Sequence, residues 1–330
     1  MDPVNNLPWE SDTLPLMLAP MQGLTNRALR DLFIHWVRPD VVFTEYVRVH
    51  AKSKLIISKS DRREITGAVE GVPLVVQLIG SDTPSLVEGA ELVRDLGVNH
   101  LNINLGCPYG RMNSGTAGGA LLADPSGLSA MLTELRRAIR GSFSVKVRAG
   151  FDDPSQIFSL IAIFEQSGVD FIILHPRTVV QRYGGYADHD ITARLVEATS
   201  LPVIANGDIF SAEFGREVMT QTKAAGLMLG RGAIGDPLLF ARLRGEYPDR
   251  STPEQRLAEL RYYLENLMES YQTLFCGDQQ LLPKLKEVIA QIHDPEFGPY
   301  AKKLKKCRKS EPFSHLLGKL PLLDPTHPEK

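Results

Sequence analysis

The sequence predicts an α/β fold, a (β/α)8 TIM-type barrel followed by a small all-helical domain. Short apolar runs rich in β-branched residues occur eight times, helix-like segments separate them, and the pattern after residue 245 is helical only. Eight strand and helix units over residues 1–245 match the usual number and length of such a barrel. We therefore assign residues 1–245 to a barrel domain and residues 246–330 to a helical domain.

The strands follow from the apolar runs. In chain order they occupy residues 15–18, 41–46, 73–79, 101–104, 143–148, 171–175, 202–206 and 225–230. Residues 83–97 and 124–141 have the apolar spacing and the turn signals of helices between strands. A doubly wound sheet also alternates in this way, but no Gly-x-Gly-x-x-Gly turn follows the first run, so the barrel is favoured.

The helical domain begins at a strong helix-start signal. Thr252 and Gln255 have the spacing of a capping box, and Pro253 stands at the first helical position. Leucines and a tyrosine then recur at three- and four-residue steps as far as Leu274, which predicts an amphipathic helix. Residues 285–292 predict a second helix, and residues 295–318 predict one or two more.

Composition excludes several classes of protein. The 330 residues are 43% hydrophobic and 23% charged, which is ordinary for a folded globular chain. Three distant cysteines suit neither a disulfide framework nor a zinc site, so we expect a reducing compartment and no metal. Acidic residues stand where a signal peptide would carry lysines, and no apolar run approaches the ~18 residues of a membrane span. We expect a cytoplasmic protein with no membrane contact.

The near-neutral net charge of −2 hides a gradient. Residues 281–330 contain 10 Lys and Arg against 6 Asp and Glu, and six of the nine residues 301–309 are basic. Such a run is either a solvated helix face or a surface for an anionic partner, and the sequence leaves both open.

Polar residues end the predicted strands, where barrel enzymes carry their catalytic groups. They are Met21, Gln22, Glu45, Gln77, Asn104, Lys146, Arg148, His175, Asn206, Asp208 and Arg231. Each alone could be an ordinary polar residue at a strand end, whereas a full set predicts a functional rim. Lys146 shares a strand face with Ser144 and Arg148, so it should point into the barrel, where a buried ammonium requires an anionic or accepting partner.

Two loops suggest chemistry at this rim. Cys107 lies in a glycine-rich loop after residues 101–104; its thiol could serve as a general acid or as a nucleophile, while Cys276 and Cys307 are expected to be small core residues. Residues 202–209 and 227–237 end two strands in glycine turns that lead into helices, a usual phosphate site in barrels, and Arg231 adds a positive charge.

Taken together, the motifs resemble those of the tRNA-dihydrouridine synthases, in order and at fitting spacing over residues 14–245. They are LAPMQGLTN (18–26), TEYVRV (44–49), VQLIGSD (76–82), NLGCP (104–108), VKVRAG (145–150), HPRT (175–178), ANGDI (205–209) and LGRG (229–232). TEYVRV and KLK (284–286) resemble the bacterial C-type subgroup. The chain departs from the family pattern at Tyr109–Arg111, at Pro176 and over residues 179–187.

The resemblance implies an FMN-binding barrel that takes electrons from NADPH or NADH. Hydride would pass from the flavin to C6 of a uracil in the D-loop of tRNA, and Cys107 would deliver the proton to C5, giving 5,6-dihydrouridine. The residues implied to hold FMN are Pro20, Met21, Gln22, Gln77, Lys146, His175, Asn206, Gly207, Asp208, Gly230 and Arg231.

The resemblance also implies an RNA-binding surface. The sequence shows no sign of an obligate protein partner, so we expect a monomer. A stacked uracil must be flipped out to be reduced, and Glu45, Asn104, Arg177 and Tyr183 are the candidates for reading or stacking it. Lys284, Lys286 and the basic residues of 302–309 would neutralise RNA phosphates.

Four other interpretations fit part of the sequence. A small-molecule flavin dehydrogenase of the dihydroorotate or dihydropyrimidine type would share the barrel, but it leaves the basic tail unexplained. A dihydrouridine synthase could act on another RNA. Lys146 could form a Schiff base in an aldolase-type barrel. A non-catalytic RNA-binding module would have no need for Cys107 and Lys146.

Overall fold

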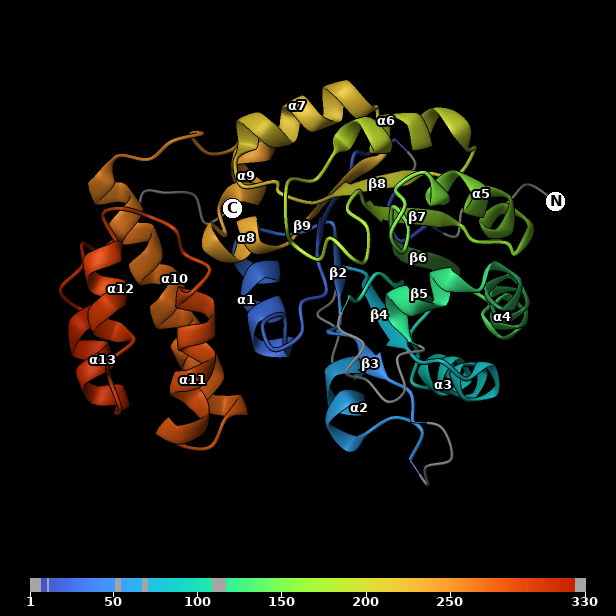
Figure 1. Cartoon of the computed structure of the whole chain (residues 1–330). Helices are drawn as coiled ribbons and strands as arrows, with labels where there is room; N and C mark the ends of the chain where they lie inside the picture. The colour runs from blue at the N-terminus through green and yellow to red at the C-terminus, as the bar shows by residue number, and fades with distance from the viewer. Residues whose placement is uncertain (1–6, 11, 51–54, 67–70, 109–116, 324–330) are drawn as a thin grey trace.

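A closed parallel barrel forms the larger part of the molecule (Figure 1). The structure, a computed structural model, describes residues 7–10, 12–50, 55–66, 71–108 and 117–323, so Tyr109–Arg111 lie outside the described residues. Every strand pairing is parallel, and the pairings of β1 with β9 and of β2 with β4 close the ring. The strands are β1 (Leu16–Leu18), β2 (Val41–Phe43), β3 (Val47–Arg48), β4 (Leu74–Ile79), β5 (His100–Leu105), β6 (Ser142–Arg148), β7 (Phe171–His175), β8 (Val203–Asn206) and β9 (Gly226–Leu229). The predicted barrel is therefore confirmed.

The second predicted strand, residues 41–46, is not continuous in the structure: β2 ends at Phe43 and β3 begins at Val47. Phe43 pairs with Val75 and Val47 with Leu78, so one extra residue lies in the segment between β2 and β3. Such a bulge re-aims the side chains at the interruption. Here it carries Glu45 and Tyr46, and it directs Tyr46 toward the cavity described below.

Helices surround the barrel in the expected alternation. They are α1 (Arg27–Trp36), α2 (Lys59–Ile65), α3 (Thr83–Asp95), α4 (Pro125–Ala138), α5 (Gln156–Gln166), α6 (His189–Ala198), α7 (Ala212–Thr222), α8 (Arg231–Gly235) and α9 (Leu239–Arg244), with a 3-10 turn over Gly118–Ala123. Most of the longer ones begin at an Asn, Ser or Asp whose side chain accepts a hydrogen bond from the first turn, as helix N-caps do.

An apolar plug fills the amino-terminal half of the barrel. Inward-facing Met17, Phe43, Phe171 and Met228 are fully buried, and the Trp9 ring packs edge-on against Phe171 at 4.8 Å between centroids. The next layer toward the carboxyl ends is polar and is described with the site. Because apolar residues fill the lower half, the space that the described residues leave for a ligand in the barrel lies at its carboxyl-terminal end.

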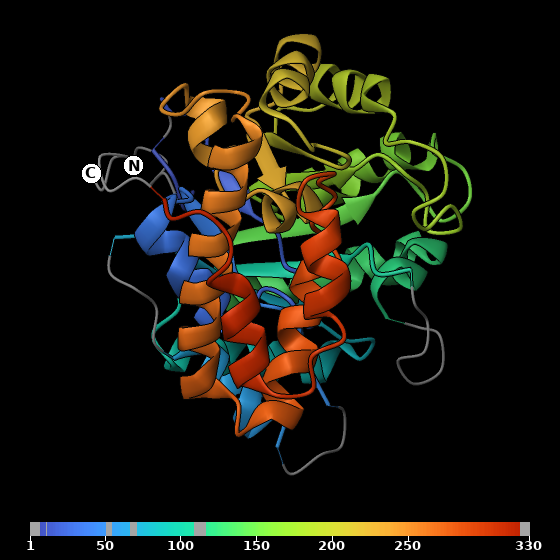
Figure 2. The same ribbon diagram turned by 90° about the vertical axis from the view of Figure 1, so that its left-hand side faces the viewer.

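The C-terminal part is helical, as predicted, and Figure 2 shows it as a layer in front of the barrel. Its described helices are α10 (Pro253–Leu274), α11 (Asp278–Ile289), α12 (Gly298–Leu304) and α13 (Ser310–Leu317). The capping box of Thr252 and Gln255 is present at the start of α10. α10 packs along α1, where the rings of Trp36 and Tyr262 lie 4.9 Å apart, so barrel and helices share one apolar core. A domain boundary at residue 245 stays a proposal.

A buried ion network fastens the two parts together. Arg242 of α9 donates to Glu259 of α10 at 2.8 Å and to Asp236 at 3.0 Å, and Arg256 bridges the same two carboxylates. Side chains of Arg242 and Glu259 are only 4% and 1% exposed. Tyr247 and Ser251 also donate to Glu259, so its charge is well compensated.

Within the described ranges, no helix combines the length and the apolarity that crossing a membrane requires. The same residues contain no group of three or more His, Cys, Asp or Glu side chains arranged to hold a metal ion.

We expect Arg242→Met to lower the free energy of unfolding by about 3–5 kcal/mol, because it leaves a buried carboxylate short of its partner. Urea unfolding followed by circular dichroism measures the loss. Arg250→Met is the control, because its ion pair with Glu213 is exposed and should contribute less than about 1 kcal/mol. Equal losses in the two variants would contradict a fastening role for Arg242.

Candidate active site

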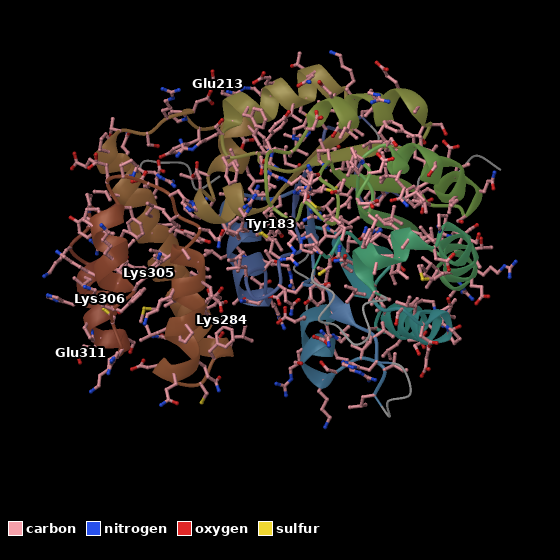
Figure 3. All side chains as sticks on the ribbon, in the orientation of Figure 1. Tyr183, Glu213, Lys284, Lys305, Lys306 and Glu311 are labelled. Carbon is pink, nitrogen blue, oxygen red and sulfur yellow. The ribbon has the colours of Figure 1, made fainter. Side chains whose placement is uncertain are left out.

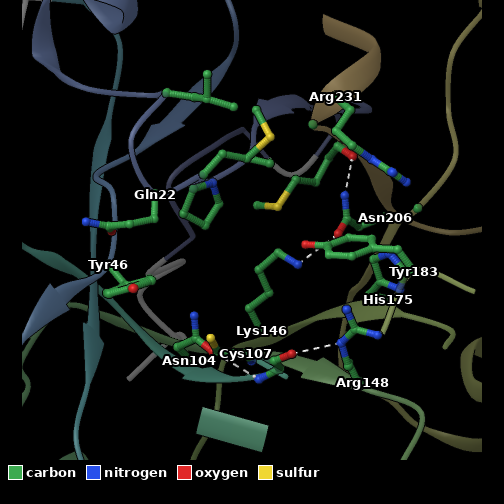
Figure 4. A pocket seen from close by; sticks show the side chains of 18 of the residues that line it. Gln22, Tyr46, Asn104, Cys107, Lys146, Arg148, His175, Tyr183, Asn206 and Arg231 are labelled. Atoms are coloured by element: carbon green, nitrogen blue, oxygen red, sulfur yellow. Dashed lines mark hydrogen bonds between the residues drawn. The ribbon is translucent and has the colours of Figure 1, made fainter. Parts of the chain in front are cut away.

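A cavity of about 700 Å³ opens at the carboxyl ends of the strands (Figure 4). Loops that follow most of the strands contribute to its wall. It is lined by all the residues that the sequence predicted for the cofactor and for acid catalysis, namely Pro20, Met21, Gln22, Gln77, Cys107, Lys146, His175, Asn206, Gly207, Asp208, Gly230 and Arg231. Two of the predicted RNA contacts, Asn104 and Tyr183, line it as well.

Lys146 points into this cavity from β6, while its neighbours Val145 and Val147 are fully buried on the other face of the strand. Its Nζ donates to Asn206 Oδ1 at 2.8 Å, and Asn206 Nδ2 in turn donates to the carbonyl oxygen of Met228. The accepting partner that the sequence required is therefore Asn206. Burial lowers the pKa of Lys146 to about 7, and the nearby charge of Arg148 acts in the same direction.

His175 lines the cavity as a neutral, incompletely bonded imidazole. Burial first, and then the charges of Lys146 and Arg148, lower its pKa well below the ordinary value. Its buried Nδ1 has no hydrogen-bond partner among the described residues. Buried polar atoms are usually paired in native proteins, so an unpaired nitrogen on a residue that lines the cavity marks a place where a polar ligand atom is expected.

An amide chain holds the Cys107 loop. Asn104 Oδ1 accepts from the backbone N–H groups of Gly106 and Cys107, at 3.1 and 2.9 Å. Asn104 Nδ2 donates to Gln77 Oε1, and Gln77 Nε2 donates to Asn102, both at 2.8 Å. Asn104 therefore fixes the position of the Cys107 backbone, in addition to the contact with the uracil that the sequence predicted for it.

The two other cysteines differ from each other. Cys276 is exposed and is not a core residue, whereas Cys307 is partly buried and packs against the edge of the apolar core. Both lie at helix ends in the C-terminal part, where the apolar spacing that predicts burial no longer applies.

One end of the cavity is suited to an anion. Gly207 has a φ of +129°, and a Cβ there would come within 2.8 Å of Ala187, so glycine is required in this turn. The Asp208 carboxylate accepts from Arg177 at 2.6 Å and from Arg231 at 3.1 Å. Burial alone would raise the pKa of Asp208, but the hydrogen bonds and charge of Arg177 lower it overall. Asp208 is thus an anchor for the arginines, and Arg231 is the charge that faces an anionic ligand.

Four predicted RNA contacts lie outside the cavity lining. Arg177 is 2% exposed and bonds to Asp208 and to the carbonyls of Gly184 and Gly185, so it supports the wall and does not face a base. Lys286 donates to the carbonyl of Cys307.

Glu45 and Lys284 bind the backbone of Gly23 from its two sides. Glu45 accepts from the N–H of Gly23 at 2.9 Å, and Lys284 donates to the carbonyl of Gly23 at 3.2 Å. Burial raises the pKa of Glu45 to about 7. These two side chains therefore secure the loop that carries Met21 and Gln22, which is a different role from the one the sequence suggested.

Several lining residues were missed by sequence reasoning. Tyr46 reaches the wall only because of the bulge, and Gln291 comes from the C-terminal helical part. Arg148 is different, because the sequence placed it at this rim together with Lys146 but assigned it no role. Phe210 carried no signal beyond its position next to the ANGDI motif.

Comparison with known proteins supplies a family. Residues 17–307 match the family model described as Dihydrouridine synthase (Dus). tRNA-dihydrouridine synthase B of Pseudomonas aeruginosa is 34% identical over 81% of this chain and 80% of its own length. tRNA-dihydrouridine(16) synthase of Haemophilus influenzae is 31% identical over 90% of this chain and 96% of its own. These relatives carry two different names, synthase B and dihydrouridine(16) synthase, so the comparison does not assign the chain to the C-type subgroup.

A solved structure supports the fold alone. Morphinone reductase in complex with tetrahydroNAD superposes with a TM-score of 0.51 at 12% identity, over 74% of this chain and 91% of that one. At so low an identity, the similarity concerns the barrel architecture and not the chemistry.

We expect Lys146→Met to change how stability depends on pH in the ligand-free protein. Lys146 has a pKa of about 7 in the folded protein, whereas a lysine in the unfolded chain has a pKa of ~10.4. Between these two pH values the unfolded chain therefore binds one proton more than the folded protein. The wild-type free energy of unfolding should therefore rise relative to that of the variant, by up to about 1.4 kcal/mol per pH unit. Urea unfolding at pH 7.5 and 9.5 measures the difference. Lys59→Met, at an exposed position, should keep the wild-type dependence, and a flat difference for Lys146→Met would contradict the lowered pKa.

Proposed function

Because this chain belongs to the dihydrouridine synthase (Dus) family, we propose that it reduces a uridine in the D-loop of tRNA to 5,6-dihydrouridine, with FMN as cofactor and NADPH or NADH as reductant. The single observation that carries the proposal is the convergence of Cys107, Lys146 and Arg231 on one cavity. We place the enzyme in the cytoplasm as a monomer. The C-type subgroup and the choice of uridine stay predictions.

The residues present fit FMN. The unpartnered Nδ1 of His175 and the ammonium of Lys146 suit the polar edge of a flavin ring, while the Gly207 turn and Arg231 suit its phosphate. When bound and reduced by NADPH or NADH, FMN would supply the hydride that reduces C6 of the uracil. The residues that would hold the ring are Pro20, Met21, Gln22, Gln77, Lys146 and His175, and those at the phosphate are Asn206, Gly207, Gly230 and Arg231, with Asp208 behind them.

Cys107 would hold the proton that the uracil receives at C5. Its Sγ–H lies at the cavity wall, and the amide pair of Asn104 and Gln77 holds its loop from below. An acid held in position transfers its proton without the entropic cost of bringing donor and acceptor together. A positioned Cys107 thiol is therefore a better proton donor than a thiol free in solution. Lys146, anchored to Asn206, would orient the ring system against which the uracil lies.

RNA would reach the cavity from the side of the C-terminal helices. A uracil has to leave its stack to enter the cavity, where Asn104 and Tyr183 line the wall. Lys302, Lys303, Lys305 and Lys306 are exposed on and after α12. Figure 3 shows Lys305 and Lys306 on the C-terminal helical part, away from Tyr183, which lies on the barrel. An RNA that contacts both must extend across these helices, as a folded tRNA can.

One observation also favours a Schiff-base enzyme. A lysine with a pKa of about 7 is the kind of amine that attacks carbonyl groups. The hydrogen bond of Lys146 to Asn206 and the family membership of the chain favour the flavin interpretation. Borohydride trapping with a carbonyl substrate separates the two, because only a Schiff base leaves a reduced covalent adduct on Lys146.

Cys107→Ala is expected to retain bound FMN and its yellow colour and to lose about 10²–10⁴-fold in turnover, the contribution of a positioned acid. Dihydrouridine formed in tRNA under single-turnover conditions measures the loss. In cells that lack the protein, dihydrouridine should be missing from one tRNA position and should return with the wild-type gene and with exposed Cys276→Ala, but not with Cys107→Ala. Unchanged dihydrouridine in those cells would overturn the proposed function, and normal turnover by Cys107→Ala would overturn the assignment of the acid.

The double substitution Lys305→Gln with Lys306→Gln is expected to weaken tRNA binding and to reduce the slope of log K against log salt by roughly 2, about one for each phosphate that the variant no longer neutralises. Filter binding at several salt concentrations gives the slope. Arg137→Gln with Arg140→Gln removes two exposed charges at the amino-terminal end of the barrel and should leave the slope unchanged. If the two pairs of substitutions have the same effect on the slope, Lys305 and Lys306 do not contact the RNA.

A further inference from the structure

Arg148 is the last residue of β6, and neither the proposed binding of FMN nor the proton transfer uses it. It is 3% exposed, and its guanidinium lies at the cavity wall beside Tyr183 (Figure 4). A buried guanidinium requires several acceptors, so its partners indicate what it does.

One side of the guanidinium holds the Cys107 loop. Arg148 Nε donates to the carbonyl oxygen of Gly106 at 2.8 Å, and Gly106 directly precedes Cys107. The N–H groups of Gly106 and Cys107 are bonded on the other side to Asn104. The peptide before the thiol is thus fixed by its N–H through Asn104 and by its carbonyl through Arg148.

The other side of the guanidinium holds the loop between β7 and α6. Arg148 Nη1 donates to the carbonyls of Thr178 and Arg182, at 2.9 and 2.6 Å. Its guanidinium carbon also lies 5.4 Å from the centroid of the Tyr183 ring, a cation–π distance. Arg148 therefore bonds to this loop and to the Cys107 loop at once.

The conformation of the loop indicates that these bonds matter. Arg182 has a φ of +53°, which is unfavourable for a residue other than glycine and persists only where its surroundings enforce it. Arg148 bonds to the carbonyl of this residue, and Arg177 holds Gly184 and Gly185 on the far side of Tyr183. Tyr183 itself is 48% exposed, so the two buried arginines hold in place a ring that its own burial would not fix.

We propose that Arg148 is a positioning residue. By bonding to Gly106 before Cys107 and to Thr178 and Arg182 before Tyr183, it fixes the position of the thiol relative to the Tyr183 ring. The coupling of the two loops is inferred from the hydrogen bonds of Arg148, whereas its effect on turnover rests on the proposed function. Lysine would keep the charge but cannot donate to three carbonyls in the planar geometry of a guanidinium.

The test is Arg148→Lys, compared with Arg136→Lys. Arg136 is a matched control because it also bridges loop carbonyls, those of Ile139 and Gly141, but at the amino-terminal end of the barrel. We expect Arg148→Lys to raise the rate of Cys107 alkylation by iodoacetamide roughly tenfold, as loss of about 1.4 kcal/mol of restraint would, and to raise hydrogen exchange over residues 177–187. Both variants also carry Cys276→Ala and Cys307→Ala, so that only Cys107 can be alkylated. In Arg136→Lys, neither the alkylation rate nor the hydrogen exchange should change.

Kinetics supply a third readout. We expect kcat for tRNA to fall roughly 100-fold in Arg148→Lys with little change in KM, since a displacement of about 1 Å at the acid is enough for that loss. Similar alkylation and exchange in the two variants would overturn the proposal, because Arg148 would then be structural only. Alkylation and exchange do not depend on turnover, so a wild-type protein inactive on tRNA would refute the proposed function while leaving this test intact.

If Arg148→Lys does not fold, Tyr183→Leu replaces it. This variant removes the ring beside the guanidinium and leaves the backbone bonds of Arg148 in place. We expect a smaller rise in Cys107 alkylation, about threefold, because the cation–π interaction is removed. An unchanged alkylation rate would show that the two loops are independent and would overturn the proposal.

Discussion

The parallel closure of the barrel is the constraint on which the rest of the structure depends. β1 pairs with β2 on one side and with β9 on the other, and β2 pairs with β4, so the ladder has no free edge within the ring. Because all strands run the same way, every carboxyl end reaches the same rim. Residues as distant in sequence as Met21 and Arg231 are brought to one cavity for this reason, and the apolar plug below them leaves that cavity only one place to form.

Within the rim, positive charge exceeds negative charge. Among the described lining residues, Arg48, Lys146, Arg148 and Arg231 are basic, and Asp208 is the one carboxylate. Asp208 is itself committed to Arg177 and Arg231, so it neutralises little of what faces the cavity. The lowered pKa values of Lys146 and His175 express the same condition, since a desolvated site with excess positive charge disfavours further protonation. An anionic ligand relieves it, which links the electrostatics of the rim to the proposed cofactor and RNA.

The C-terminal helices are joined to the barrel more firmly than a mobile appendage would be. They share an apolar core with α1, the network of Arg242 and Glu259 crosses the junction, and Lys284 reaches back to the peptide of Gly23. Gln291 even contributes to the cavity wall. The surface proposed to bind RNA and the cavity proposed to reduce it therefore belong to one packed unit, which keeps their spacing constant.

Local patterns determined much of this protein. The barrel strands, the capping box of Thr252, the inward direction of Lys146 and most of the strand-end residues at the cavity follow from periodicity and position along a strand, because short-range sterics and burial control them. Tertiary structure alone decided the partners: that Asn206 accepts from Lys146, that Arg177 and Glu45 support the walls, and that Arg148 joins two loops. Such contacts join side chains to atoms 22 to 60 residues away, and a spacing rule carries no information about which atoms the barrel brings together.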